Sequence, residues 1–208
     1  MQIPFKQITV PPGSQAILRG LDWQDFEALL EEAGEHRAVR YAYHHGELEI
    51  MSPLAEHEFN KSIIASIIEI LLEEMDLEFI ALGSTTLKNT LAAQAVEPDE
   101  CFYVRHEAEV RGKARLNLDI DPPPDLALEI DLSSRTHFRH YAGLGIPELW
   151  RYDGKELEIL LLEEGGYRAA DTSLLFPQFE LKALVPELVR KARQEGRNKS
   201  LKAFRQAV

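Results

Sequence analysis

Hydrophobic and polar residues alternate with two different periods along the first part of the chain. From Trp23 the apolar residues recur every three or four positions, which is the spacing of a helix that buries one face. Asp22 and Gly34 are suited to begin and end that helix, as its N-cap and its stop signal. Within residues 37–51 the period falls to two in a pair of short runs around a His-Gly dipeptide, which predicts a β-hairpin.

The strongest helical pattern of the chain comes next. Ser52 and Pro53 predict its start, because serine caps helices and proline fits the first helical position, where a backbone N–H has no helical partner. An apolar stripe with helical spacing then follows, made of Ile63, Ile64, Ile67, Ile68, Leu71, Leu72 and Met75. Such a stripe predicts a long helix that packs against a larger body.

Strand patterns dominate the middle of the chain. Residues 78–88, 100–105 and 115–120 each have the composition or the alternation of a β-strand. After three consecutive prolines, residues 125–131 alternate strictly: the even-numbered positions are apolar and three of the odd-numbered ones are acidic. One face of this strand is therefore expected to enter the core, and the other face is acidic.

The remaining segments predict a mixed sheet with a helical end. We expect a short helix near residues 136–145, followed by two strands, ELWRYD and ELEILLL, that an Asp-Gly turn connects. Helical segments around 180–194 and 199–207 close the chain. Because no repeat or flexible linker interrupts this order, we predict one α/β domain over residues 1–208.

Composition and charge narrow the class of protein. Hydrophobic residues make up 45% of the 208 positions, which is an ordinary globular value. The formal net charge of −12 argues against a general nucleic-acid binder. Residues 182–208 nevertheless carry eight Lys or Arg against two Glu. This basic tail fits either a solvated amphipathic helix or a contact with phosphate, and both interpretations stay open.

The cysteine content and the N-terminal segment indicate the cellular compartment of the protein. Cys101 is the single cysteine, so an internal disulfide is excluded and a reducing compartment is indicated. The first residues lack the pattern of a signal peptide, and no apolar run is long enough for a membrane span. We therefore expect a cytoplasmic protein.

Three carboxylates on separate predicted elements are candidates for chemistry. Glu58 lies near the start of the long helix, Asp99 begins a strand, and Glu129 belongs to the acidic strand face. Asp131 projects from the same side of that strand as Glu129. Carboxylates gathered in a partly buried site oppose one another's ionisation unless a cation lies among them. Oxygen ligands without cysteine favour Mg²⁺, Mn²⁺ or Ca²⁺ over zinc.

Each of these residues also has a purely structural explanation. A glutamate near a helix N-terminus interacts favourably with the helix dipole. An aspartate after a proline is common in turns, and one acidic face is typical of a strand in a half-exposed antiparallel sheet. Their joint occurrence favours a common site.

Five segments give the chain a resemblance to a known group of proteins. In order along the chain they are GELEIMSPLAEHE, GSTTLK, VEPDECFYV, PPDLALEIDLSSRT and YAGLGIPELWRYD. With these segments the chain resembles the Uma-two family of bacterial endonuclease-like proteins, within the PD-(D/E)xK superfamily that contains the type II restriction endonucleases. The resemblance covers roughly residues 40–180.

The resemblance implies a restriction endonuclease-like αβββαβ core, preceded by a helix and a hairpin and followed by a helical tail. It also implies that Asp99 and Glu129 bind Mg²⁺ or Mn²⁺ and that Glu58 assists them. We expect Asp131, on the same strand face as Glu129, to be a further ligand. The reaction would be hydrolysis of phosphodiester bonds in DNA. A homodimer would supply the two sites that double-strand cleavage needs, whereas nicking needs one.

One position departs from the superfamily pattern. A lysine is expected two residues after the strand glutamate, where this chain has Asp131. Lys88, Lys61 and Arg135 are candidates to supply the missing positive charge, and Lys88 is preferred.

This departure keeps two other hypotheses open. The first is a nuclease-fold protein without catalysis, which binds nucleic acid or a protein partner. The second is a structural, oligomer-forming protein whose acidic strand face is exposed to solvent.

Overall fold

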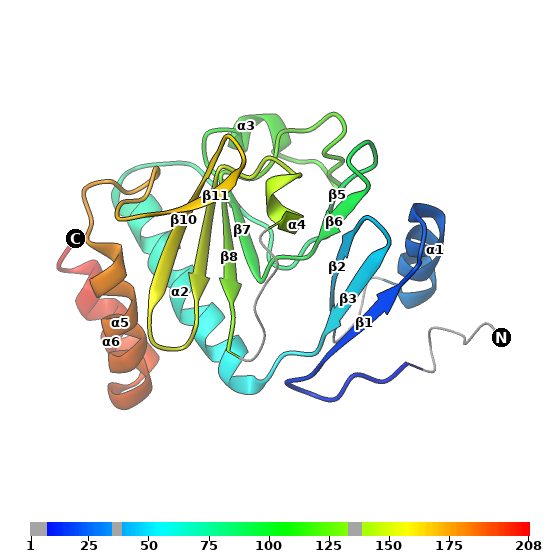
Figure 1. The fold of residues 1–208 in the computed structure, drawn as a ribbon. Helices are drawn as coiled ribbons and strands as arrows, with labels where there is room; N and C mark the ends of the chain where they lie inside the picture. The colour runs from blue at the N-terminus through cyan, green and yellow to red at the C-terminus, as the bar shows by residue number, and fades with distance from the viewer. Residues whose placement is uncertain (1–7, 35–38, 133–138) are drawn as a thin grey trace.

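A computed structural model describes residues 8–34, 39–132 and 139–208 (Figure 1). Its helices are α1 (Trp23–Ala33), α2 (Ala55–Glu74), α3 (Glu107–Val110), α4 (Arg139–Ala142), α5 (Leu181–Glu195) and α6 (Arg197–Arg205). Its strands are β1 (Gln15–Arg19), β2 (Arg40–His44), β3 (Glu47–Met51), β4 (Ile80–Ala81), β5 (Leu87–Asn89), β6 (Gln94–Val96), β7 (Glu100–Tyr103), β8 (Leu126–Ile130), β9 (Glu148–Tyr152), β10 (Leu157–Glu163) and β11 (Gly166–Ala170).

The larger sheet has six strands in the order β11-β10-β9-β8-β7-β4. Its paired strands are antiparallel except β8 and β9, which are parallel. A parallel pair needs a crossover connection, and here the crossover contains α4. The chain order α2–β4–β7–β8–α4–β9 is therefore the αβββαβ core that the resemblance implies.

The smaller sheet has five antiparallel strands in the order β1-β3-β2-β6-β5, at the right of Figure 1. On one face of the β2–β3 hairpin, Phe26 of α1 packs with the buried side chains of Tyr43 and Leu48. Side chains alternate across a strand, so Arg40 and Glu49 project from the opposite face of the hairpin. This second face points toward the larger sheet and contributes to the site described below.

Helix α2 packs along the larger sheet through the predicted apolar stripe. Six side chains of the stripe are completely buried: Ile63, Ile64, Ile67, Ile68, Leu71 and Leu72. They share a core with Leu126, Leu128 and Ile130 of β8. Because full burial of one such side chain stabilises a fold by about 1.5–3 kcal/mol, α2 is a principal anchor of the sheet.

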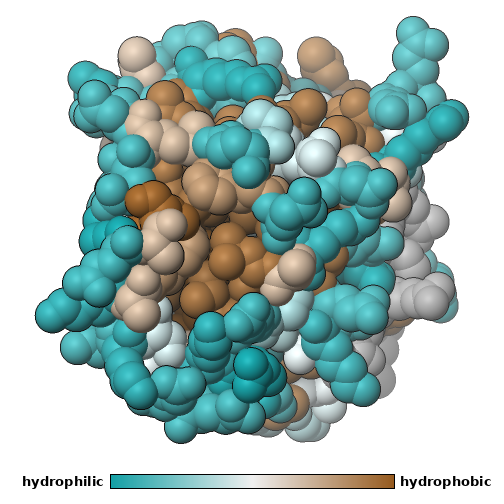
Figure 2. All heavy atoms as spheres, turned by 90° about the vertical axis from the view of Figure 1, so that its left-hand side faces the viewer, coloured by the Kyte–Doolittle hydropathy of each residue, from teal (hydrophilic) through white to brown (hydrophobic). Residues whose placement is uncertain are grey.

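The C-terminal tail also belongs to this core. Helices α5 and α6 lie against α2 (Figure 1), with Val185, Val189, Leu201 and Phe204 buried. On the face of the molecule where these helices lie, hydrophilic side chains surround a central apolar area (Figure 2). The packing supports the interpretation of the tail as a pair of amphipathic helices.

Several element predictions are confirmed in detail. The Asp22 side chain accepts a hydrogen bond from the Asp25 N–H at 2.8 Å, and the Asp25 side chain accepts one from the Asp22 N–H, which makes a capping box at the start of α1. Gly34 ends this helix. The predicted hairpin is β2–β3, and its turn contains His45 at a φ of 44° and Gly46 at 90°.

The predicted start of the long helix is wrong by two residues. Helix α2 begins at Ala55, not at Pro53. The reason lies in Ser52, whose carbonyl accepts a hydrogen bond from Gly13 N–H at 2.7 Å and whose N–H donates to the Ser14 carbonyl. These bonds extend the pairing of β1 with β3 by one residue. The backbone of Ser52 is therefore part of the sheet, and the helix begins after it.

Two predicted strands are also wrong. Residues 78–88 contain β4 and the start of β5, which belong to different sheets. Residues 115–120 form turns, because the Asp121 carboxylate accepts the Asn117 N–H at 2.8 Å and bends the chain. For the helix expected near residues 136–145, the structure contains α4, and the positions before it lie outside the described residues.

None of the helices in the described part of the chain combines the length and the apolar character that a membrane span requires.

Candidate active site

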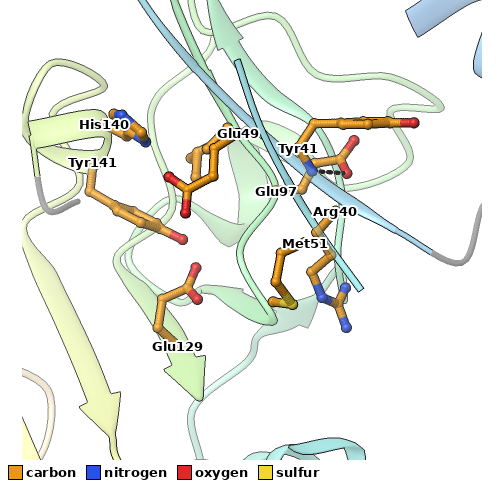
Figure 3. A pocket seen from close by; sticks show the side chains of 10 residues that line it. Arg40, Tyr41, Glu49, Met51, Glu97, Glu129, His140 and Tyr141 are labelled. Atoms are coloured by element: carbon orange, nitrogen blue, oxygen red, sulfur yellow. Dashed lines mark hydrogen bonds between the residues drawn. The ribbon is translucent and has the colours of Figure 1, made fainter. Parts of the chain in front are cut away.

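A cavity of about 50 Å³ lies between the β2–β3 hairpin and strand β8. Arg40, Glu49, Glu97, Glu129 and Tyr141 are among the residues that line it (Figure 3). A space of this size holds a few water molecules, or an ion with part of its hydration shell.

Pairing between β7 and β8 brings Asp99 beside Glu129. Glu100 lies opposite Leu128, and the Asp99 N–H donates to the Leu128 carbonyl at 3.1 Å. Asp99 and Glu129 therefore project from the same face of the sheet. Asp99 is completely buried and Glu129 is 6% exposed, so the hypothesis that the acidic strand face is exposed to solvent is wrong.

Both oxygens of the Asp99 carboxylate have partners within the protein. The Nε atom of Arg40, at the start of β2, lies 2.8 Å from Oδ1. The Nε2 atom of His57, in the first turn of α2, lies 2.9 Å from Oδ2, which also accepts the Ile130 N–H at 2.7 Å. Three elements of the fold thus meet at this carboxylate.

Glu58 lies at the rim of the same cluster. Its carboxylate is 2.9 Å from Nη2 of Arg40 and 2.8 Å from Nζ of Lys61. Burial alone would raise the pKa of Glu58, but the hydrogen bond from Lys61 and the charges of Lys61 and Arg40 together hold it below its usual value. Glu58 is therefore ionised at neutral pH and keeps two cations in place.

Glu129 has the opposite electrostatic environment. Burial raises its pKa well above the usual value, and the negative charge of Asp99 raises it further. Arg40 opposes this effect, whereas Asp131 and Glu49 add to it. The protein therefore holds Glu129 where a negative charge is poorly compensated.

Asp131 is placed by the parallel neighbour strand. Its N–H donates to the Tyr152 carbonyl at 2.8 Å, and its carboxylate lies 3.6 Å from Nη1 of Arg151 on β9. Arg151 also contacts Glu158 at 3.1 Å. The acid that replaces the superfamily lysine is thus paired with an arginine from β9.

The candidates for the missing positive charge have different positions. Lys61 contacts Glu58, as described above. Lys88 pairs with Glu27 of α1, so the structure does not support the preference for Lys88. Arg135 lies outside the described residues. Arg40, which the sequence did not suggest, contacts two of the predicted carboxylates, Asp99 and Glu58.

The model of the Uma2 family, described as "Putative restriction endonuclease", matches residues 23–193. The chain belongs to the Uma2 family. A comparison with curated proteins finds no match.

The fold of this Uma2 member also occurs in a solved structure. It is similar to the crystal structure of a "putative nuclease belonging to DUF820" from Anabaena variabilis ATCC 29413, with a TM-score of 0.54 and 11% sequence identity. The similarity covers 87% of this chain and 99% of the other. Identity this low shows a shared fold, so the roles of single residues depend on the geometry found here.

Four residues of the site were not identified from the sequence: Arg40, His57, Glu49 and Tyr141. For Arg40 and Glu49 a signal existed, because both occupy the polar positions of the alternating hairpin strands. What the alternation could not show is that this polar face packs against the acidic face of β8.

The donor set fits a hard divalent cation at Glu129. No hydrogen bond from a described residue reaches the Glu129 carboxylate, which is buried beside the negative charges of Asp99, Asp131 and Glu49. Within the described ranges, no three Asp, Glu, His or Cys side chains form a ready ligand group. Mg²⁺ typically binds one or two carboxylates and keeps several waters, so a site of few protein ligands suits it.

Proposed function

We propose that the protein is a metal-dependent endonuclease that hydrolyses phosphodiester bonds in DNA. The observation that carries the proposal is the position of Asp99 and Glu129 on one buried face of an αβββαβ core. These two carboxylates would hold Mg²⁺ or Mn²⁺, with Asp131 and Glu58 beside them. The bound metal would supply a water of lowered pKa and stabilise the charge that develops on the phosphate.

The remaining site residues position these groups. Arg40 contacts both Asp99 and Glu58, so it supplies positive charge in a site without the superfamily lysine. A guanidinium group matches phosphate oxygens well, because its donors form a rigid planar fork. His57 lies beside the other oxygen of the Asp99 carboxylate, with its Nε2 atom 2.9 Å from Oδ2.

A non-catalytic role is the second candidate function, and the contacts of Asp99 favour it. Arg40 and His57 lie within ion-pair distance of its two oxygens, and the Ile130 N–H donates a hydrogen bond to Oδ2. Ion pairs of this kind can stabilise the fold without a metal. Under this hypothesis the protein binds nucleic acid or a protein partner and does not cleave.

Nicking of supercoiled plasmid with Mg²⁺ or Mn²⁺ tests the proposal. We expect Asp99→Asn and Glu129→Gln each to lower the nicking rate by roughly 10²-fold or more, because each removes charge that acts on the transition state. Asp171→Asn and Glu163→Gln are the matched controls, since both acids are exposed and pair with surface cations. Circular dichroism of all five proteins verifies folding.

Two outcomes contradict the proposal. Equal nicking by the wild type and all four variants would eliminate the site. Binding of Mn²⁺ without cleavage of any nucleic acid supplied would establish the second candidate function.

The finer parts of the proposal concern assembly and location. A homodimer would present two sites to the two strands of DNA, and light scattering coupled to size-exclusion chromatography measures the mass directly. We also propose a cytoplasmic location, to which the free and buried thiol of Cys101 is suited.

A further inference from the structure

We propose that Glu49 and Tyr141 belong to the same cation site as Glu129, with the Tyr141 hydroxyl bound to a water molecule of the hydrated ion. The inference rests on the metal dependence proposed above. It adds a residue of the N-terminal hairpin and a residue of α4 to a site that the sequence assigned to β7, β8 and the start of α2.

The carboxyl groups of Glu49 and Glu129 face the same cavity. Glu49 projects from β3 and Glu129 from β8, and their carboxyl groups point toward one another (Figure 3). The negative charge of Glu49 also raises the pKa of Glu129, which requires the two groups to be close. Two acids that face each other across a small cavity repel, and a divalent cation between them removes the repulsion.

Tyr141 gives an independent indication of a ligand. Its side chain is completely buried and lines the cavity, yet its hydroxyl has no hydrogen-bond partner among the described residues. In Figure 3 the hydroxyl lies between the carboxyl groups of Glu49 and Glu129. A buried hydroxyl without a partner costs roughly 1–3 kcal/mol, so an occupant of the cavity that accepts a hydrogen bond from it would be favoured.

Glu97 shows what a purely structural carboxylate looks like in the same cavity. One of its oxygens accepts the Tyr41 N–H at 3.0 Å, and the other accepts the Thr86 hydroxyl at 2.5 Å. Both oxygens of Glu97 therefore have donors from the protein. The Glu129 carboxylate receives none from a described residue, although it lines the same space.

The chemistry of the cavity selects the class of ligand. Of the described residues that line the cavity, Arg40 is the one lysine or arginine, and it contacts Asp99 and Glu58. Two carboxylates and a hydroxyl are hard oxygen donors, which suit Mg²⁺ or Mn²⁺ better than a softer metal. A cavity of about 50 Å³ leaves room for the waters that Mg²⁺ retains.

Calorimetric titration with Mn²⁺ alone, without nucleic acid, tests the inference. We expect Glu49→Gln to weaken Mn²⁺ binding at least about tenfold and Tyr141→Phe to weaken it by up to about tenfold. Glu47→Gln is the matched control, because Glu47 lies on the same strand but pairs with the exposed Arg19. Tyr141→Phe should melt no earlier than the wild type in EDTA, since it removes an unsatisfied hydroxyl.

Asp99→Asn and Glu129→Gln make the two proposals distinguishable. If these variants lose Mn²⁺ but Glu49→Gln and Tyr141→Phe bind as the wild type does, the inference is overturned and the proposed function stands. If Glu49→Gln and Glu129→Gln lose Mn²⁺ while Asp99→Asn retains it, the inference stands and the assignment of Asp99 falls. If every variant binds Mn²⁺ normally, both are overturned.

Discussion

Acidic side chains are used in two contrasting ways in this molecule. In the tail interface, acids of α2 meet arginines of α5 and α6: Glu56 lies 2.7 Å from Arg193, and Glu73 lies 2.6 Å from Arg205. All four side chains are about half exposed. Such exposed ion pairs help to orient the helices but contribute little to the free energy of unfolding.

The acidic site, made of Glu49, Asp99, Glu129 and Asp131, has the opposite character. Glu49 and Glu129 line a cavity beside Arg40. Burial raises the pKa of Glu129, and the negative charges of Asp99, Asp131 and Glu49 raise it further. The arrangement is unfavourable for folding alone. An excess of buried negative charge is therefore the better guide to function than the conspicuous basic composition of the tail.

The largest effect on stability is expected for Arg40→Gln. This substitution leaves Asp99 buried without its arginine, and breaking a buried ion pair costs about 3–5 kcal/mol. Urea unfolding at 25 °C measures the loss, with Arg19→Gln as control because Arg19 pairs with Glu47 at an exposed position. An equal, small change in both variants would show that the acidic site does not need its internal cation.

A smaller effect of opposite sign is expected for Glu129→Gln. Burial and the charge of Asp99 raise the pKa of Glu129, so folding disfavours its ionised form, and its neutral replacement should raise the free energy of unfolding at pH 7 without metal by roughly 0.5–2 kcal/mol, the usual size for a stabilising substitution. Glu163→Gln, at an exposed position, should change little. A clear destabilisation by Glu129→Gln would mean that the charge of Glu129 supports the fold.

The pH dependence of stability tests the same residue. A carboxyl group with a raised pKa in the folded state contributes stability below its unfolded pKa, and this contribution is lost as the pH rises through the folded pKa. For Glu129 the loss begins near the usual value of 4.5 and extends upward from there. We expect urea unfolding of the wild type to show this decline relative to Glu129→Gln, and parallel pH profiles would contradict it.

The sequence predicts an element correctly when the element depends on neighbouring residues, and it fails where contacts between residues distant in the sequence decide the structure. The apolar stripe from Ile63 to Leu72 predicts α2 correctly, because helical burial follows from local spacing. The start of α2 was wrong because Ser52 pairs with the distant Ser14. Likewise, turn bonds at Asp121 override the local alternation that predicted a strand.

In the candidate site, too, the local patterns are predictable and the long-range contacts are not. Convergence of Asp99 and Glu129 could be predicted because both lie on strands expected to be neighbours in one sheet. The contacts of Arg40 and His57 with Asp99 could not, since they depend on how a second sheet and a helix terminus pack against that strand. No local pattern encodes the packing of two sheets.

The smallest effect is expected in the tail interface. A double-mutant cycle with Glu56→Gln and Arg193→Gln should give a coupling free energy of about 0.2–1 kcal/mol, which is the usual range for exposed pairs. High salt should reduce it, because exposed charges are screened over distances of a few ångströms at 1 M ionic strength.

The same Arg193→Gln variant decides whether the tail contacts phosphate. Since Arg193 already bonds Glu56 and Asn60, we expect its removal to leave the salt dependence of DNA binding unchanged. A contact with phosphate would instead lower the slope of log K against log salt concentration by about one. That result would show that the tail exchanges its internal partners for DNA, and the contrast between a paired, structural tail and a buried site where neighbouring acids oppose the charge of Glu129 would no longer hold.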